Sequence, residues 1–174
     1  MKYQSVLLGL ASTCAAIDGY VYLDNTYCGG NWLGFKGINP NVCYSASRAG
    51  QSIGWYYVPD GWNLETRNYH YANCDEGSVD HANILGYQGS SMCVPAGPRF
   101  DRYQSLGYGF LGRKRSTAKD VGDCVKPDTF GLADGTMFNL TAMSDAQVEQ
   151  LLDSADPETA GLVDVADLFK EYIM

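Results

Sequence analysis

The segment SIGWYYVPDGWNLETR, residues 52–67, carries the pattern that decides the fold. In its first half Ile53, Trp55 and Tyr57 alternate with their neighbours, and large and polar residues alternate again in its second half. Strict alternation is the period of a half-buried β-strand. The intervening Pro59-Asp60-Gly61 is typical of a turn. The segment therefore predicts a β-hairpin with one buried face.

Further short runs rich in aromatic and branched residues are separated by Gly, Asn and Pro, as strands bounded by turns would be. They are residues 20–23, 32–35, 83–87, 91–94 and 103–110. We predict a mainly β fold: an antiparallel β-sandwich stabilised by disulfides, with a C-terminal hairpin and a short helical segment.

The composition excludes several classes of partner. The chain has 174 residues, with 12 basic against 20 acidic side chains and a formal net charge of −8. This length allows one ordinary domain or two small ones. Nucleic acids and anionic membrane surfaces would repel the charge, so we expect neither as a partner. The 13% aromatic content is too high for a wholly disordered chain.

Residues 1–16 are predicted to be a secretory signal peptide. Lys2 supplies a positive charge, residues 5–11 form a short apolar run, and Cys14-Ala15-Ala16 places small residues where a signal peptidase cleaves. A membrane span needs about 20 apolar residues, and Asp18 comes too early for one. We expect a secreted, extracellular protein with no membrane span.

The cysteines that remain after signal removal predict disulfides, because an exported chain meets an oxidising compartment. The disulfide candidates are Cys28, Cys43, Cys74 and Cys93. Of the three pairings that four cysteines allow, we favour the local one, Cys28 with Cys43 and Cys74 with Cys93. Cys124 is the odd fifth cysteine, expected to be unpaired or to link two segments of the chain.

Arg113-Lys114-Arg115 is the only run of consecutive basic residues, and the composition changes there. Residues 17–115 carry 8 basic and 8 acidic side chains, whereas residues 116–174 carry 3 and 12, a net charge of −9. We therefore predict a β-sandwich domain at 17–112, this dibasic linker, and an acidic C-terminal segment at 116–174. Two alternatives stay open: cleavage after Arg115 at an exposed joint by a protease that recognises paired cations, or an uncut basic turn.

The acidic segment predicts a hairpin and a helix. Residues 124–141 place a turn at Ala133-Asp134-Gly135 between short apolar runs. Asn139, in Asn-Leu-Thr, is an N-glycosylation acceptor. Ser144 is positioned to cap a helix. The apolar face of that helix consists of Val148, Leu151, Leu152 and Ala155.

A degenerate EF-hand pattern follows this helix. Its carboxylates, at loop positions 1, 3, 9 and 12, are Asp156, Glu158, Asp164 and Asp167. Such oxygen ligands suit Ca²⁺, but position 5 is Ala160 and no second loop is present to pair with. The alternative is an acidic loop between two packed segments. Ca²⁺ is the one cofactor that the sequence suggests.

Catalytic patterns are weak. Residues 50–54 match the G-x-S-x-G motif, in which a nucleophilic Ser stands between a strand and a helix, but a strand follows Ser52 here. His70 and His81 lack the spacing of a zinc site. We expect no catalytic residue and no enzyme, with a small Ser hydrolase as the least favoured alternative.

The tryptophans suggest a second alternative, a carbohydrate-binding, lectin-like module. Trp55 alternates with Ile53 and is expected in the core, whereas Trp32 and Trp62 lie beside turn residues and are the candidates for an exposed stacking surface. For both of these, burial in the core is the competing expectation.

A resemblance is carried by residues between about 40 and 110: Cys43, the strand at 52–58, Pro59 to Trp62, Tyr71-Ala72-Asn73-Cys74, Gly77 and Cys93. This region resembles small secreted, cysteine-containing, effector-like proteins of filamentous fungi with a βγ-crystallin-like sandwich. The resemblance implies a non-enzymatic protein that acts by binding an extracellular protein or glycan. The calcium signature of the crystallin family is missing here, so the resemblance implies no calcium site in this region.

Overall fold

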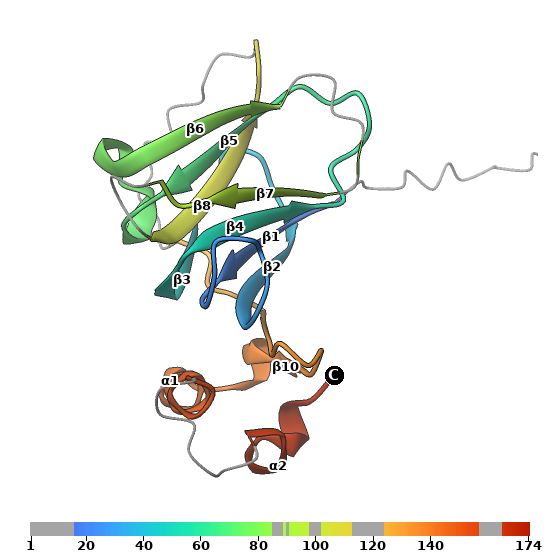
Figure 1. Cartoon of the computed structure of the whole chain (residues 1–174), viewed down its shortest axis with the longest axis vertical. Coiled ribbons are helices and arrows are strands. Elements are labelled where there is room, and N and C mark those ends of the chain that lie inside the picture. Colours follow the sequence, from blue (N-terminus) through green and yellow to red (C-terminus); the bar gives the residue numbers. More distant parts are fainter. Residues whose placement is uncertain (1–15, 85–88, 90, 98–101, 113–123, 157–164) are drawn as a thin grey trace, which may run out of the picture.

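The computed structural model describes residues 16–84, 89, 91–97, 102–112, 124–156 and 165–174. Its strands form two antiparallel sheets that pack face to face (Figure 1). The predicted fold class is confirmed: the protein is mainly β, carries two disulfides, and ends in a hairpin and a short helix.

The larger sheet, sheet A, has the strand order β10-β9-β2-β1-β4-β7. Its strands are β1 Ile17–Tyr22, β2 Trp32–Ile38, β4 Ser52–Tyr56, β7 Ser91–Pro95, β9 Thr129–Gly131 and β10 Met137–Asn139. Sheet B has the order β3-β8-β5-β6. Its strands are β3 Tyr44–Gly50, β5 Leu64–Tyr69, β6 Val79–Ile84 and β8 Tyr103–Phe110.

The helical elements are short, and those of the C-terminal segment gather at one end of the sandwich (Figure 1). They are η1 Ala72–Cys74, η2 Glu76–Ser78, η3 Leu140–Ala142, α1 Asp145–Ser154, α2 Val165–Leu168 and η4 Lys170–Tyr172. The predicted cap of α1 is confirmed as a capping box, in which Ser144 and Gln147 satisfy each other's backbone N–H groups. Its apolar face buries Leu151 and Leu152.

The predicted hairpin at 52–67 is wrong, because its two strands lie in different sheets. β4 pairs with β1 and β7, and β5 pairs with β6 and β8. The chain leaves β4 at Tyr57, whose φ of 58° takes it out of the strand direction. Trp55 and Leu64 then face the same core from opposite sides. Alternation predicts which face of a strand is buried but not which strand is its partner.

The second predicted hairpin is confirmed and extends sheet A. β9 and β10 pair through Phe130 and Phe138, both buried, and β9 also pairs with β2, where Leu33 opposes Phe130. Just before β9, the Asp128 carboxylate accepts a hydrogen bond from the Lys36 N–H at 2.7 Å. The first part of the chain and the acidic segment therefore share one sheet.

Helix α1 is fastened to the sandwich by polar contacts. The buried Asn31 donates from Nδ2 to the Ala155 carbonyl at 3.1 Å, and its Oδ1 accepts from the Ala133 N–H at 3.0 Å. Arg48, on β3, forms ion pairs with Asp153 and Glu149 of the helix. The acidic segment thus covers one end of the sandwich and complements a cation there.

The disulfides join Cys28 with Cys93 and Cys43 with Cys74. All four predicted candidates are therefore disulfide-bonded, but the favoured local pairing is wrong. Cys28 lies in the loop between β1 and β2 and meets β7 of the same sheet, whereas Cys43 lies directly before β3 of the other sheet. The Sγ of Cys124 lies 2.7 Å from that of Cys43.

Trp55 connects the two sheets through the core. It is fully buried on β4 of sheet A, and its indole N–H donates to Asn68 Oδ1 on β5 of sheet B at 3.2 Å. Asn68 in turn donates from Nδ2 to the Asp80 carbonyl on β6 at 3.3 Å. Both side chains are thus hydrogen-bonded where water is excluded, as buried polar groups must be.

We predict that Asn68→Ala lowers the free energy of unfolding by about 1–3 kcal/mol or more, because it leaves the indole N–H of Trp55 buried without an acceptor. Trp55→Phe alone instead leaves the Asn68 amide oxygen without the indole donor. The double variant Trp55→Phe/Asn68→Ala removes both polar groups and should lose less than the sum of the single variants. Urea denaturation measures all four proteins, and additive losses would contradict the link.

Candidate functional site

The outer face of sheet A carries a cluster of aromatic side chains, which we call the aromatic face. Its members are Tyr20 and Tyr22 on β1, Trp32 on β2 and Tyr56 on β4. Their neighbours Val21, Leu33 and Trp55 point the other way, into the core, because side chains alternate along a strand. The aromatic face is therefore separate from the packing between the sheets.

The rings of the aromatic face contact one another. Tyr20 stacks on Trp32 with ring centroids 4.3 Å apart and planes 12° apart, and its centroid lies 4.8 Å from that of Tyr56. The hydroxyl oxygens of Tyr22 and Tyr56 are 2.6 Å apart and share a hydrogen bond. Tyr20, Trp32 and Tyr56 remain partly exposed.

Three glycines make room for these rings. A Cβ at Gly34 would lie 2.6 Å from the Trp32 ring, and one at Gly54 would lie 2.6 Å from the Tyr56 ring. A Cβ at Gly131, on β9, would also collide with the Trp32 ring. The acidic segment therefore supplies part of the surface on which Trp32 rests.

This arrangement was not predicted, because the glycines were interpreted as turn residues. The available signal was glycine two residues from an aromatic residue within a strand, as in Trp32–Gly34 and Gly54–Tyr56. Such pairs point to the same face of a sheet, so the small residue leaves space for the large one.

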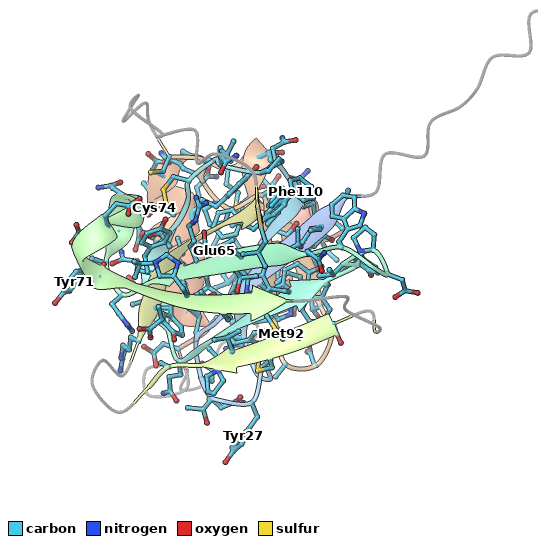
Figure 2. All side chains as sticks on the ribbon, turned by 90° about the horizontal axis from the view of Figure 1, so that it is seen from above. Tyr27, Glu65, Tyr71, Cys74, Met92 and Phe110 are labelled. Carbon is cyan, nitrogen blue, oxygen red and sulfur yellow. A yellow bond between two sulfur atoms is a disulfide. The ribbon has the colours of Figure 1, made fainter. Side chains whose placement is uncertain are left out.

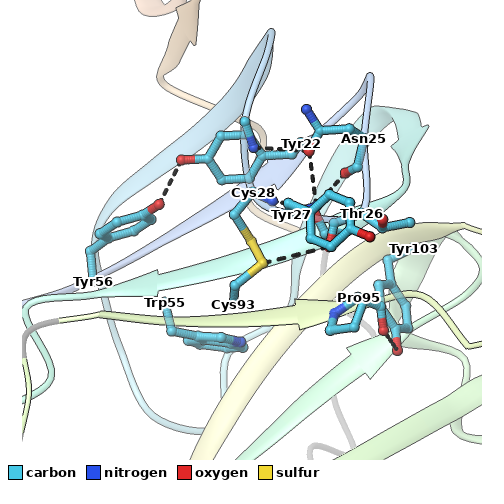
Figure 3. Close-up of a disulfide and its surroundings, with 12 residues drawn as sticks. Tyr22, Asn25, Thr26, Tyr27, Cys28, Trp55, Tyr56, Cys93, Pro95 and Tyr103 are labelled. Carbon is cyan, nitrogen blue, oxygen red and sulfur yellow. Dashed lines mark hydrogen bonds between the residues drawn. A yellow bond between two sulfur atoms is a disulfide. The ribbon is translucent and has the colours of Figure 1, made fainter.

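The loop at 23–31 lies beside the aromatic face and is fixed by covalent and hydrogen bonds. The Cys28–Cys93 disulfide ties it to β7, close to Tyr22 and Tyr56 (Figure 3). The Ser52 hydroxyl donates to the Asn25 carbonyl at 2.8 Å and accepts from the Cys28 N–H at 3.2 Å. The Asn25 side chain further accepts from the Tyr27 N–H at 2.9 Å.

Two further tyrosines project near this face. Tyr27 is 88% exposed at the tip of the fixed loop, and Figure 2 shows it pointing away from the body of the protein. Tyr57, 63% exposed, follows Tyr56 at the end of β4. Exposed tyrosines on a rigid support offer contact area at low cost in conformational entropy.

The environment of the aromatic face keeps two of its phenols neutral. Burial raises the pKa of Tyr20, and the neighbouring Asp18 carboxylate raises it further. Burial also raises the pKa of Tyr22, together with its hydrogen bond to Tyr56. Both groups therefore act as neutral hydroxyls, able to donate and accept hydrogen bonds.

The predicted tryptophans do not form one site. Trp32 is partly exposed and belongs to the aromatic face. Trp62 instead packs against the core and against Phe110 of sheet B, with ring centroids 5.0 Å apart. The predicted burial of Trp55 is confirmed.

The residues of the weak catalytic patterns have structural partners. Ser52 is fully buried and its hydroxyl holds the loop at 23–31. His70 is buried, with Nε2 3.0 Å from an Asp80 carboxylate oxygen and Nδ1 2.7 Å from the Arg102 carbonyl. His81 lies 3.4 Å from a Glu65 carboxylate oxygen. These contacts do not bring Ser52 and either histidine together.

The remaining predicted site residues lie in the C-terminal segment or between the two parts. Asn139 accepts hydrogen bonds at Oδ1 from the N–H and hydroxyl of Thr141, at 3.0 and 2.7 Å. Asp156 lies two residues after the end of α1, and Asp167 lies in α2. Outside the described residues are Arg113, Lys114, Arg115, Glu158 and Asp164. Among the residues that the structure describes, no group of three or more acidic, His or Cys side chains is arranged to hold a metal ion.

Comparison with known proteins places this disulfide-linked β-sandwich in a family. A family model described as an N-terminal domain, ARB_05566_N, matches residues 18–128, and the chain belongs to this family. The matched region begins in β1 and runs through Cys124 to Asp128, directly before β9. The match carries no link to βγ-crystallins or to effectors.

No curated protein and no solved structure matches the chain. In the part of the chain that the structure covers, no helix has the length and apolar character needed to cross a membrane.

The pKa directions predict a loss of stability at alkaline pH. Tyrosines of the unfolded chain ionise near pH 10, whereas Tyr20, Tyr22 and Tyr103 keep their protons in the folded state because burial raises their pKa. The unfolded state then binds fewer protons, so the free energy of unfolding falls as the pH rises above about 10, and this effect is absent at neutral pH.

The contribution of Tyr22 can be separated by substitution. Tyr22→Phe should make the alkaline fall in stability shallower by up to about 1.4 kcal/mol per pH unit, the value for one proton. Tyr27→Phe, at an exposed position, is the matched control. Urea denaturation over a pH series measures the slopes, and equal slopes for the wild type and Tyr22→Phe would contradict the assignment.

Proposed function

We propose that this protein is a secreted, non-enzymatic binding protein that holds an extracellular ligand on the aromatic face. The observation that carries the proposal is the position of Tyr20, Trp32 and Tyr56, which lie partly exposed on the solvent side of sheet A. Aromatic residues there contribute nothing to the core between the sheets, and Tyr and Trp are enriched at the centres of recognition surfaces.

Export to the cell exterior agrees with the two disulfides, which form and persist in oxidising compartments. β1 begins at Ile17, directly after the expected cleavage site at Ala16. At the sequon, both hydrogen bonds end on Asn139 Oδ1 and not on Nδ2, the atom that would carry a glycan. The proposal therefore includes removal of the signal peptide and glycosylation of Asn139. The resemblance to small secreted proteins of filamentous fungi implies an effector-like role, and we include this role in the proposal.

A carbohydrate is the second candidate function, as ligand of a lectin-like module. The stack of Trp32 and Tyr20 offers an apolar surface for the C–H face of a sugar ring. The Asp18 carboxylate lies 3.4 Å from the Tyr20 hydroxyl, so acceptors and donors for sugar hydroxyls stand beside the stack. Trp62 has no part in this version, because it packs away from the aromatic face.

The acidic segment is proposed as a capping element of the sandwich. β9 pairs with β2, Gly131 supports Trp32, and Asn31 bonds to both Ala133 and Ala155. A segment built into the sheet in this way is expected to stay in place after a cut in the dibasic linker. These contacts favour a capping element over a released pro-segment.

We predict that Trp32→Ala weakens ligand binding at least tenfold, because truncation of a central aromatic anchor costs about 2 kcal/mol or more. Tyr71→Ala, which removes an exposed ring beside η1, is the matched control. Sedimentation with insoluble chitin, cellulose and β-glucan tests the carbohydrate candidate, and capture from extracellular fluid tests a protein partner. If folded Trp32→Ala still binds the ligand, the aromatic face is not the binding site. If Trp32→Ala and Tyr71→Ala both lose binding, the effect is nonspecific.

We further predict that cleavage after Arg115 leaves the two parts associated. The cut protein should elute as one species under native conditions, because separation would expose Phe130 and Phe138, both fully buried. Size-exclusion chromatography followed by intact-mass analysis under denaturing, reducing conditions measures both states. Elution of two separate species under native conditions would contradict the capping role.

A further inference from the structure

The three cysteines Cys43, Cys74 and Cys124 form a sulfur cluster on the side of the sandwich where β3 meets η1. Cys43 is bonded to Cys74, and the Cys124 thiol is directed at the Cys43 sulfur over 2.7 Å. Thiol–disulfide exchange requires a thiol close to one sulfur of a disulfide. Cys124 meets this requirement at Cys43.

Backbone hydrogen bonds hold Cys124 in this position. The Val125 N–H donates to the Cys43 carbonyl at 3.0 Å, and the Ser45 N–H donates to the Val125 carbonyl at 3.0 Å. Val125 thereby forms a parallel bridge to Tyr44. Cys43 and Cys124 are adjacent because the chain segments that carry them are paired through their backbones. Their proximity therefore does not depend on the rotamer of either side chain.

The other sulfur is also fixed in place. The Cys74 N–H donates to the Ser105 hydroxyl at 3.0 Å, and the Asn73 N–H donates to the Ser45 hydroxyl at 3.3 Å. Cys43 thus lies between two cysteines, each anchored to the backbone around β3 and β8. No change of sheet pairing is needed for Cys43 to bond to either one.

The cluster is accessible from outside. Cys43, Cys74 and Cys124 are all partly exposed, and Cys124 lines a groove of about 1070 Å³ between β3, η1 and α1, together with Ser45, Asn73 and Lys126. Water or a small thiol can therefore reach the sulfurs, which exchange requires. The Cys28–Cys93 disulfide lies on the other sheet, at the loop beside the aromatic face.

We propose that the sulfur cluster is a thiol–disulfide exchange site in which Cys43 alternates between Cys74 and Cys124 as its disulfide partner. The Cys124 thiol loses its proton to water and its thiolate attacks the Cys43 sulfur. The Cys43–Cys124 bond forms, the Cys43–Cys74 bond breaks, and Cys74 leaves as a thiolate that takes up a proton. One disulfide and one thiol are present before and after, so no external oxidant or reductant is consumed.

The exchange changes which parts of the chain are covalently joined. The Cys43–Cys74 bond closes a loop of 31 residues within the first part. The Cys43–Cys124 bond spans 81 residues and crosses the dibasic linker. In the second form a chain cut after Arg115 stays joined even when unfolded, whereas in the first form it is held by noncovalent contacts alone.

Peptide mapping under non-reducing conditions tests the exchange. The full-length secreted protein is incubated with a catalytic amount of a small thiol at mildly alkaline pH, quenched with acid, alkylated and digested. We expect both the Cys43–Cys74 and the Cys43–Cys124 peptides, in a ratio that the incubation shifts, while the Cys28–Cys93 peptide stays constant as the internal control. A single pairing of Cys43 that persists through the incubation would overturn the proposal.

Two variants make the outcome independent of the wild-type ratio. Cys124→Ser should retain the Cys43–Cys74 peptide alone, and Cys74→Ser should gain the Cys43–Cys124 peptide alone. Formation of the Cys28–Cys93 peptide reports that each variant folds. Alkylation of both Cys43 and Cys124 in folded Cys74→Ser would also overturn the proposal. If Cys74→Ser does not fold, the wild-type map decides.

Discussion

The hydrogen bond from Trp55 to Asn68 constrains much of the architecture. It joins β4 of sheet A to β5 of sheet B inside a core that water does not enter, so β4 and β5 must face each other across the sandwich. This relation requires the chain between them to cross from one sheet to the other, and the turn after Tyr57 does so. Once Trp55 points inward, its neighbours on β4 must point outward, and Tyr56 becomes part of the aromatic face. The burial of Trp55 and the exposure of Tyr56 are therefore both set by the orientation of β4.

Local patterns in the sequence predict the strands of this fold but not their partners. β1, β2, β4, β7 and β8 coincide with runs of aromatic and branched residues, whose shape suits a pleated surface. β3, with the sequence YSASRAG, was missed because its small and polar residues carry no such signal. It is a strand because β8 pairs with it, an interaction between residues far apart in sequence. For the same reason the disulfide pairing was wrong, since Cys28 and Cys43 are close along the chain but belong to different sheets.

The candidate site was predictable only in part. Trp32 was a candidate because of the small residues around it, but its partners Tyr20 and Tyr56 come from strands that pair with each other only in the folded protein. Gly131, which gives Trp32 its space, lies in the segment that composition assigned to a separate acidic part. A net charge of −9 describes the surface of that segment. Its buried residues, which decide where it packs, are uncharged and include Phe130, Phe138 and Leu151.

The pairing of β9 with β2 also has a consequence for the protein before it is complete. Without the hairpin, β2 would present a row of unpaired N–H and C=O groups at the edge of sheet A. Such an edge is a template for strands of other molecules, and an aromatic side chain beside it favours their addition. During synthesis β2 emerges roughly a hundred residues before β9, and for that interval the nascent chain has an open edge. The β9–β10 hairpin thus prevents intermolecular β-pairing at β2. It can do so only after β9 and β10 have been synthesised.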